Sequence, residues 1–164
     1  MSEKVLAKIG KAAELYHRLL LIAAPSGCGK TAVLQDVATR TGAPLLNLNL
    51  ELSRRMLDLT KRQRALQLPR VLEEVVGRDH PVVLLDNIEI LFDVTLEQDP
   101  LRLLQGVSRN RTIIAAWNGA LESGYLTYAT PGHPEYRRYA SRELVVICPD
   151  RPVGSDRAQQ AGVA

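Results

Sequence analysis

One short segment constrains this chain more than any other: a glycine-rich turn that ends in Lys-Thr and lies between an apolar run and a helical pattern. It reads Ala24-Pro25-Ser26-Gly27-Cys28-Gly29-Lys30-Thr31 and follows the pattern GxxxxGK[ST], except that Ala24 replaces the first glycine. This pattern is the P-loop (Walker A), whose backbone N–H groups bind nucleotide phosphates. The first position needs a small residue at the end of a strand, and Ala24 meets that need.

The mechanism of a P-loop assigns a role to each part of the segment. Gly27 and Gly29 allow the backbone to point successive N–H groups at phosphate oxygens, and the helix that begins near Gly29 adds its N-terminal amides and dipole. Lys30 is expected to reach the β- and γ-phosphates, and the Thr31 hydroxyl to bind Mg²⁺. The alternative, a chance glycine-rich turn, does not explain the strand before it and the helix after it. We therefore predict that ATP and Mg²⁺ bind at Pro25, Ser26, Gly27, Cys28, Gly29, Lys30 and Thr31.

Apolar runs separated by helical patterns predict an α/β fold. Runs typical of strands buried on both faces of a parallel sheet occur at residues 19–24, 82–85, 112–117 and 144–147. A strand with one polar face is expected at residues 45–50, where Leu and Asn alternate. Strands that alternate with helices imply right-handed crossovers and helices on both faces of the sheet. We therefore predict a three-layer P-loop NTPase domain with a five-stranded parallel sheet over residues 1–150.

The spacing of apolar residues predicts helices at residues 5–16, 31–39, 51–76 and about 100–105, with an interruption at Pro69. A loop is expected from residue 118 to 133, followed by a short polar helix that ends near Ala140. Residues 151–164 are polar and rich in Gly and Ala, so we expect a disordered tail there.

The composition excludes several classes of protein. A hydrophobic fraction of 46% and a charged fraction of 24% are those of an ordinary soluble protein, and a net charge of +3 gives little support for nucleic acid as the main partner. No stretch has the features of a signal peptide or a membrane span. The two cysteines, Cys28 and Cys148, lack metal-like spacing and indicate reduced thiols. We expect a cytoplasmic protein that does not enter a membrane.

A second motif follows the most apolar strand. Residues 82–86 read Val-Val-Leu-Leu-Asp, the Walker B form. Because parallel strands end at the same edge of a sheet, Asp86 is expected beside the P-loop, where it can hold a water on the Mg²⁺ that Thr31 also binds. The alternative is a solvated Asp that caps the next helix.

The residues after Asp86 leave the water-activating group open. In ATPases of the AAA+ type, a Glu usually follows the Walker B Asp and polarises the attacking water, whereas this chain has Asn87 there. Asn87 cannot accept a proton, although an amide can orient a water. Glu89 is the nearest carboxylate and takes the role if the local turn points it inward; otherwise it is a surface residue.

Asn118 follows the strand at residues 112–117. It matches the polar sensor residue of AAA+ proteins, which lies at the end of the strand between the Walker A and Walker B strands. Its amide is expected to contact the γ-phosphate or the water. The alternative is that Asn118 and Gly119 form a plain turn. AAA+ proteins usually continue with a helical lid after the fifth strand, and we expect no such lid here.

A nucleotide-binding site on an open sheet edge is commonly completed by a residue of a neighbouring subunit. This predicts a homo-oligomer with a shared site. Ser141-Arg142 precedes the fifth strand, as does the Ser-Arg pair of clamp-loader-type AAA+ proteins, whose Arg contacts the next subunit's γ-phosphate. Arg142 is therefore the candidate for this role, or else a solvated arginine. Its rivals are Arg137 and Arg138, and less so Arg109 and Arg111.

Two further groups of residues indicate contacts with partners. The region between residues 54 and 70 is basic and could bind DNA phosphates or an acidic protein, or be a solvated helix face; its charges include Arg54, Arg55, Lys61, Arg62 and Arg64. Tyrosines cluster after the sensor strand, which suits either an interface or loop packing: Tyr125, Tyr128, Tyr136 and Tyr139.

Nearly the whole chain up to residue 147 resembles the BrxF family, the small P-loop proteins of type 3 BREX (bacteriophage exclusion) defence systems. The resemblance rests on the Walker A segment and on LNLNLELSRR at residues 46–55, LLDNIEILF at 84–92, DPLRLLQG at 99–106, and SRNRT and AAWNG within 108–119. It implies a bacterial cytoplasmic protein in a phage-defence complex. Its implied partners are other BREX components, among them a methyltransferase, a phosphatase-like protein, a helicase and a larger ATPase.

Three functions compete at this point. The first is an oligomeric AAA+-like ATPase within a defence complex, which Asp86, Asn118 and Arg142 favour. The second is a nucleotide-gated scaffold that binds ATP with little hydrolysis and recruits defence components or DNA, which Asn87 favours. The third, a small-molecule kinase, is disfavoured because the strand motifs are those of a hydrolase. ATP is favoured over GTP because no Asn-Lys-x-Asp guanine-binding motif occurs.

Overall fold

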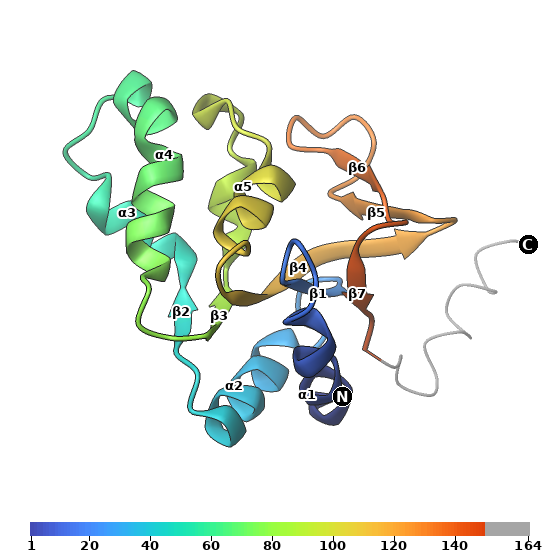
Figure 1. Ribbon diagram of the computed structural model, residues 1–164. Coiled ribbons are helices and arrows are strands. Elements are labelled where there is room, and N and C mark those ends of the chain that lie inside the picture. The colour runs from blue at the N-terminus through green and yellow to red at the C-terminus, as the bar shows by residue number, and fades with distance from the viewer. Residues whose placement is uncertain (150–164) are drawn as a thin grey trace, which may run out of the picture.

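The computed structural model describes residues 1–149, and a parallel sheet runs through the middle of them (Figure 1). Its parallel strands lie in the order β2-β3-β4-β1-β7. They are β1 (Leu19–Ala24), β2 (Leu45–Asn47), β3 (Val82–Asp86), β4 (Thr112–Glu122) and β7 (Val145–Ile147). The α/β class is confirmed, and β4 lies between the two motif strands as expected. The tail predicted at residues 151–164 lies outside the described residues.

Helices cover both faces of the sheet (Figure 1). On one face lie α1 (Ser2–Ala12) and α2 (Lys30–Thr41), and on the other α3 (Leu48–Arg55), α4 (Lys61–Val76) and α5 (Pro100–Val107). Successive residues of β1 alternate between the two layers: Leu20 and Ile22 pack with α1 and α2, whereas Leu19 and Leu21 pack with the other three helices. Because both faces are buried, the central strands are continuously apolar, which is why the sequence made them easy to locate.

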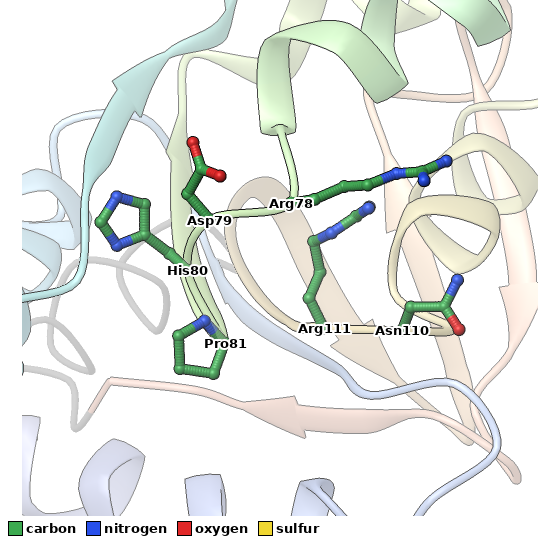
Figure 2. Close-up of a pocket in the computed structure, with 6 residues that line it drawn as sticks. All are labelled: Arg78, Asp79, His80, Pro81, Asn110 and Arg111. Atoms are coloured by element: carbon green, nitrogen blue, oxygen red, sulfur yellow. The ribbon is translucent and has the colours of Figure 1, made fainter.

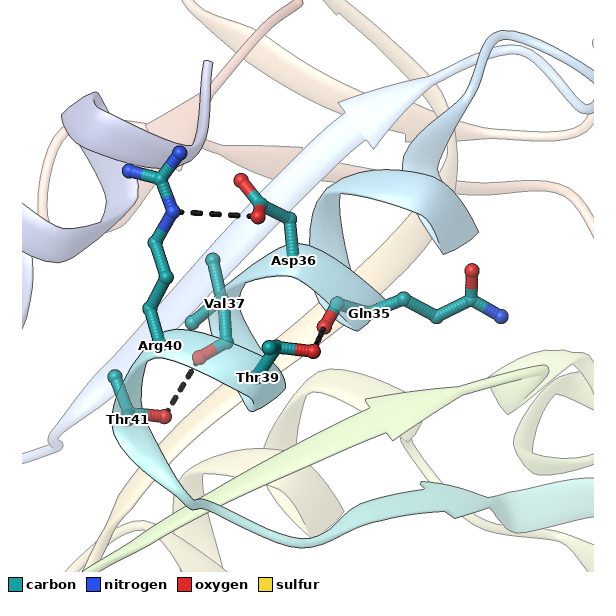
Figure 3. Close-up of polar contacts among 6 residues, drawn as sticks. All are labelled: Gln35, Asp36, Val37, Thr39, Arg40 and Thr41. Atoms are coloured by element: carbon teal, nitrogen blue, oxygen red, sulfur yellow. Dashed lines mark hydrogen bonds and ion pairs between the residues drawn. The ribbon is translucent and has the colours of Figure 1, made fainter.

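An ion pair and two side-chain hydrogen bonds lie in the C-terminal half of the helix that follows the P-loop (Figure 3). Asp36 and Arg40 form an ion pair of 3.2 Å, and the Thr39 and Thr41 hydroxyls donate to backbone carbonyls one turn earlier, at 3.0 and 2.7 Å. The helix ends at Gly42, whose φ of 72° is the left-handed cap conformation that glycine adopts at least cost. These contacts lie in the second half of α2, whereas Lys30 and Thr31 are its first two residues.

The strand predicted at residues 45–50 is wrong in its second half, because β2 ends at Asn47 and α3 begins at Leu48. The Asn47 side chain accepts a hydrogen bond from the Leu50 N–H at 3.1 Å and so caps the new helix. The alternation of Leu and Asn fits a strand, but the capping bond and the packing of Leu48 and Leu52 favour a helix.

The predicted break at Pro69 is also wrong, because α4 continues through it and the helical region is divided earlier, at residues 56–60. Thr60 and Gln63 form a reciprocal capping box that starts α4. Pro69 has no N–H for the Ala65 carbonyl, but the Gln98 side-chain amide donates to that oxygen at 2.8 Å. A distant residue thus satisfies the carbonyl that proline leaves free.

The sheet has seven strands, not five, because the chain after Trp117 forms an antiparallel extension. β4 continues to Glu122 and pairs with β5 (Tyr125–Tyr128), which pairs with β6 (Arg137–Ala140). The loop expected from residue 118 and the short helix near Ala140 are therefore wrong. The turn depends on two residues with positive φ, Ser123 at 49° and Gly124 at 80°. We call β5 and β6, with their connecting loop, the hairpin.

Gly119 is where the hairpin approaches β4 most closely, which gives a test of the fold. A Cβ at this position would lie 1.8 Å from the Thr127 carbonyl oxygen, a backbone atom that cannot move aside alone. We expect Gly119→Ala to destabilise the protein by about 1–3 kcal/mol in urea denaturation. Gly106 in α5 is the matched control, because a Cβ there meets nothing within 4 Å. Gly106→Ala should leave stability equal or raise it by up to about 1 kcal/mol, and equal losses in both variants would contradict the packing argument.

Candidate nucleotide-binding site

The P-loop connects the C-terminal end of β1 to the first residue of α2. Gly27 and Gly29 have φ of 80° and 83°, the left-handed region that other residues rarely adopt. A Cβ at either position would meet no atom within 4 Å, so the backbone conformation and not a lack of space requires glycine here. The turn is thus the concave, glycine-dependent structure that the sequence pattern predicts.

Lys30 lies underneath this turn and is 6% exposed. Its ammonium group donates to the Ala24 and Pro25 carbonyl oxygens at 2.7 and 2.8 Å. Burial lowers the pKa of Lys30, while the charges of Cys28, Glu89 and Asp86 act in the opposite direction. A buried ammonium group supported mainly by neutral carbonyls is well suited to gain a negatively charged ligand.

Thr31 and Asp86 meet across the end of the sheet. The Thr31 hydroxyl donates to Asp86 Oδ2 at 2.7 Å, and Asp86 Oδ1 accepts from the Asn87 N–H at 3.0 Å. A hydroxyl and a carboxylate are the hard oxygen ligands that Mg²⁺ prefers. Within residues 1–149 no group of three or more His, Cys, Asp or Glu could hold a metal ion. The residues fit an ion bound by one or two protein oxygens together with nucleotide phosphates and water.

Glu89 and Asn118 also meet at this edge. Asn87 adopts a left-handed conformation with φ of 53°, and a 3-10 helix, η1 (Ile88–Phe92), starts directly after it. This path turns Glu89 towards β4, where its Oε1 accepts a hydrogen bond from Asn118 Nδ2. Asn118 is paired with Ala24 at the start of the P-loop. Glu89 rather than Asn87, whose side chain is exposed, is therefore directed towards the P-loop edge.

Arg142 lies away from this chain's own P-loop. It is exposed and precedes β7 by three residues, and β7 is parallel to β1. Arg142 therefore lies near the edge at which the parallel strands begin, whereas the P-loop lies at the edge at which they end.

The rival arginines all have partners within the chain. Arg111 is buried and donates to the Val107 carbonyl at 2.8 Å and to Glu73 at 3.1 Å, so it is unsuited to reach a neighbouring subunit. The other three also have contacts: Arg109 with the Tyr16 hydroxyl and ring, Arg138 with the Tyr125 ring and Arg137 with the Gln98 carbonyl.

The basic region does not form a single helix. Arg54 and Arg55 belong to α3, and Lys61, Arg62 and Arg64 to α4. The Arg64 Nε donates to the Met56 and Leu59 carbonyls, both at 3.0 Å, so this side chain braces the turn between the helices. The remaining basic residues of this set are exposed, and one of them, Arg55, lies 3.9 Å from the Glu74 carboxylate.

A polar cavity of about 570 Å³ lies at the opposite edge of the sheet, where β3 and β4 begin (Figure 2). It is lined by Arg78, Asp79, His80, Pro81, Asn110 and Arg111. Apart from Arg111, none of the residues predicted to act at the nucleotide lines it. The P-loop lies instead at the edge where β1 ends, and its residues 25–29 are exposed.

The comparisons with known proteins agree with this geometry. The family model described as "ATPase family associated with various cellular activities (AAA)" matches residues 20–117, which is more than half of the chain. The match runs from β1 through the P-loop and Asp86 to the residue before Asn118. No curated protein matches the chain. In residues 1–149, no helix has the length and apolar character needed to cross a bilayer.

The contact between Thr31 and Asp86 gives a test of the metal site. Asp86→Ala removes the carboxylate, so we expect affinity for ATP to fall at least about tenfold with Mg²⁺, equivalent to about 1.4 kcal/mol, and less in EDTA. Calorimetric titration in the two buffers measures both. Asp79→Ala is the matched control, because Asp79 is an exposed carboxylate at the far edge (Figure 2). Equal losses with and without Mg²⁺ would exclude Asp86 from metal binding.

Proposed function

The chain belongs to the AAA family of ATPases, and we propose that it binds ATP with Mg²⁺ at residues 25–31 and Asp86 and hydrolyses the γ-phosphate. One observation carries this proposal: Lys30, the Thr31–Asp86 pair and the Glu89–Asn118 pair converge where β1 and β3 end on either side of β4. This is the set of groups that phosphate binding, metal binding and water activation require.

The chemistry assigned to these residues is simple. The Glu89 carboxylate accepts a proton from a water whose oxygen attacks the γ-phosphorus. The bond to the oxygen that bridges the β- and γ-phosphorus atoms breaks, and this oxygen leaves with ADP. Lys30 and the P-loop amides stabilise the phosphate charge, and Asn118 orients the γ-phosphate or the water. When bound, Mg²⁺ neutralises charge on the phosphates, held by Thr31 and Asp86.

The contact between Glu89 and Asn118 also favours the second candidate, a nucleotide-gated scaffold with little hydrolysis. While Glu89 accepts from the Asn118 amide, part of its acceptor capacity is used within the chain, which weakens it as a base for water. Turnover would then be slow, although the remaining lone pairs of the carboxylate can still accept from a water. The scaffold would still bind ATP, so turnover distinguishes the two functions.

Lys30→Ala tests nucleotide binding, which both candidates require. The variant loses the buried ammonium group beneath the P-loop, so we expect no measurable ATP binding by calorimetry and no turnover. Lys8→Ala removes an equal charge from the exposed face of α1 and should bind ATP as the wild type does. Unchanged affinity in Lys30→Ala would overturn the proposed site.

We further propose a homo-oligomer in which Arg142 of one subunit completes the site of the next. The location of Arg142 near the opposite sheet edge supports a role in trans over one in cis. On the BrxF resemblance, we propose that this oligomer works in the bacterial cytoplasm within an anti-phage BREX complex. DNA contact through the basic residues of α3 and α4 belongs to the same proposal.

Mixing two inactive variants tests the shared site. Arg142→Ala retains the pocket and Lys30→Ala retains the arginine, so a mixture should recover part of the turnover that each variant lacks alone. An arginine acting in trans is worth roughly 10³- to 10⁵-fold in rate, which makes partial recovery measurable. Specific activity of the wild type should also rise with protein concentration, followed with mass by light scattering. No recovery at any ratio would contradict a shared site.

A further inference from the structure

Four aromatic rings form a cluster directly behind the Glu89–Asn118 pair. Phe92 and Tyr128 are stacked with centroids 3.5 Å apart, and Trp117 meets both rings edge-on at 5.1 and 6.1 Å. Tyr139 closes the cluster at 6.0 Å from Trp117, and its hydroxyl donates to Asp99 at 3.0 Å. The rings come from η1, β4, β5 and β6, so the cluster joins the catalytic edge of the sheet to the hairpin.

Both members of the Glu89–Asn118 pair are attached to this cluster through the chain. Glu89 precedes Phe92 by one turn of η1, and Asn118 directly follows Trp117. The Trp117 indole N–H donates to the Thr127 carbonyl at 3.0 Å, which fixes β4 against the hairpin. A shift of the cluster would therefore move the carboxylate and the amide relative to each other.

Tyr128 is the cluster residue whose hydroxyl is affected by the charge of Glu89. It is 7% exposed, and burial raises the pKa of its hydroxyl to about 12, an effect to which the Glu135 and Glu89 charges add. The phenol therefore stays neutral at physiological pH. Tyr125, on the same strand, instead contacts Arg138, 3.6 Å from its ring centroid.

We propose that Tyr128 is a positioning residue for ATP hydrolysis, holding Phe92 and Trp117 so that Glu89 and Asn118 face each other at the γ-phosphate. The inference rests on the proposed ATPase function. It makes the hairpin part of the catalytic unit, because Tyr128 lies on β5. It also predicts that nucleotide at the site affects Trp117, since Asn118 directly follows Trp117 in β4. ATP affinity depends mainly on the P-loop, so the cluster affects kcat and leaves binding unchanged.

Steady-state kinetics of three tyrosine variants test the proposal. Tyr128→Leu removes the stacked ring, so kcat should fall about 10- to 100-fold, as expected for a misplaced catalytic group. Its calorimetric Kd for ATP should stay within about twofold of wild type, because the P-loop is untouched. Tyr128→Phe keeps the ring and should restore kcat, and Tyr125→Leu, on the other face of the same strand, should match wild type.

Trp117 supplies a second readout that does not need turnover, because it is the chain's only tryptophan and is fully buried. Titration with Mg²⁺ and a non-hydrolysable ATP analogue should change its fluorescence in the wild type. Asn118→Ala and Tyr128→Leu should lose this change while still binding the analogue.

The outcomes separate this inference from the proposed function. If the wild type does not bind ATP, the proposed function fails and the inference fails with it. If ATP binds and is hydrolysed but Tyr128→Leu keeps the wild-type kcat, or Tyr125→Leu loses as much, the inference alone is wrong. If ATP binds without turnover, the fluorescence decides, and an unchanged Trp117 signal would overturn the inference.

Discussion

The site depends on one constraint: β1, β3 and β4 are parallel and in register, so that the ends of β1 and β3 lie beside Asn118 within β4. Ala24 is paired with Asn118, and Leu85, the residue before Asp86, with Ala115. Side chains separated by 55 residues in the chain, Thr31 and Asp86, therefore come within 2.7 Å. The two-sided burial of these strands keeps that register, because a slip by one residue would turn each apolar side chain to the wrong layer.

This constraint also explains how much the sequence could predict. The P-loop, the Asp86 strand and the strand before Asn118 were predicted correctly because continuous apolar runs and glycines are local signals. The failures arose where distant residues decide the conformation. Gln98 satisfies the Ala65 carbonyl and lets α4 pass through Pro69, and no pattern near Pro69 indicates it. The hairpin depends likewise on the Trp117–Thr127 contact, and the stacking of Tyr128 on Phe92 could not have been found from spacing alone.

The local backbone geometry decides where the Glu89 side chain points, which the residue types alone leave open. A regular helix starting at Asn87 would have turned Glu89 about 200° away from it, by the 3.6-residue period. Instead Asn87 adopts a left-handed conformation, which Asn tolerates better than most residues, and the tighter η1 follows. A carboxylate two residues further along the chain than the usual position thus reaches the sensor amide. The same Asn87 carbonyl accepts from the Asn49 N–H at 3.1 Å, so α3 is attached at the same point.

The polar groups at the P-loop edge satisfy one another within the chain. Lys30 donates to two carbonyls, Thr31 to Asp86 and Asn118 to Glu89, so ATP must replace internal hydrogen bonds instead of filling open ones. The exchange favours ATP because the phosphates bring negative charge to a buried ammonium group that neutral carbonyls compensate poorly. If ATP binds as proposed, phosphate and Mg²⁺ replace the contacts of Lys30 and Thr31, whereas the Glu89–Asn118 contact need change only when a γ-phosphate approaches Asn118. On this proposal binding and hydrolysis depend on different contacts, and the aromatic cluster is attached to the Glu89–Asn118 contact.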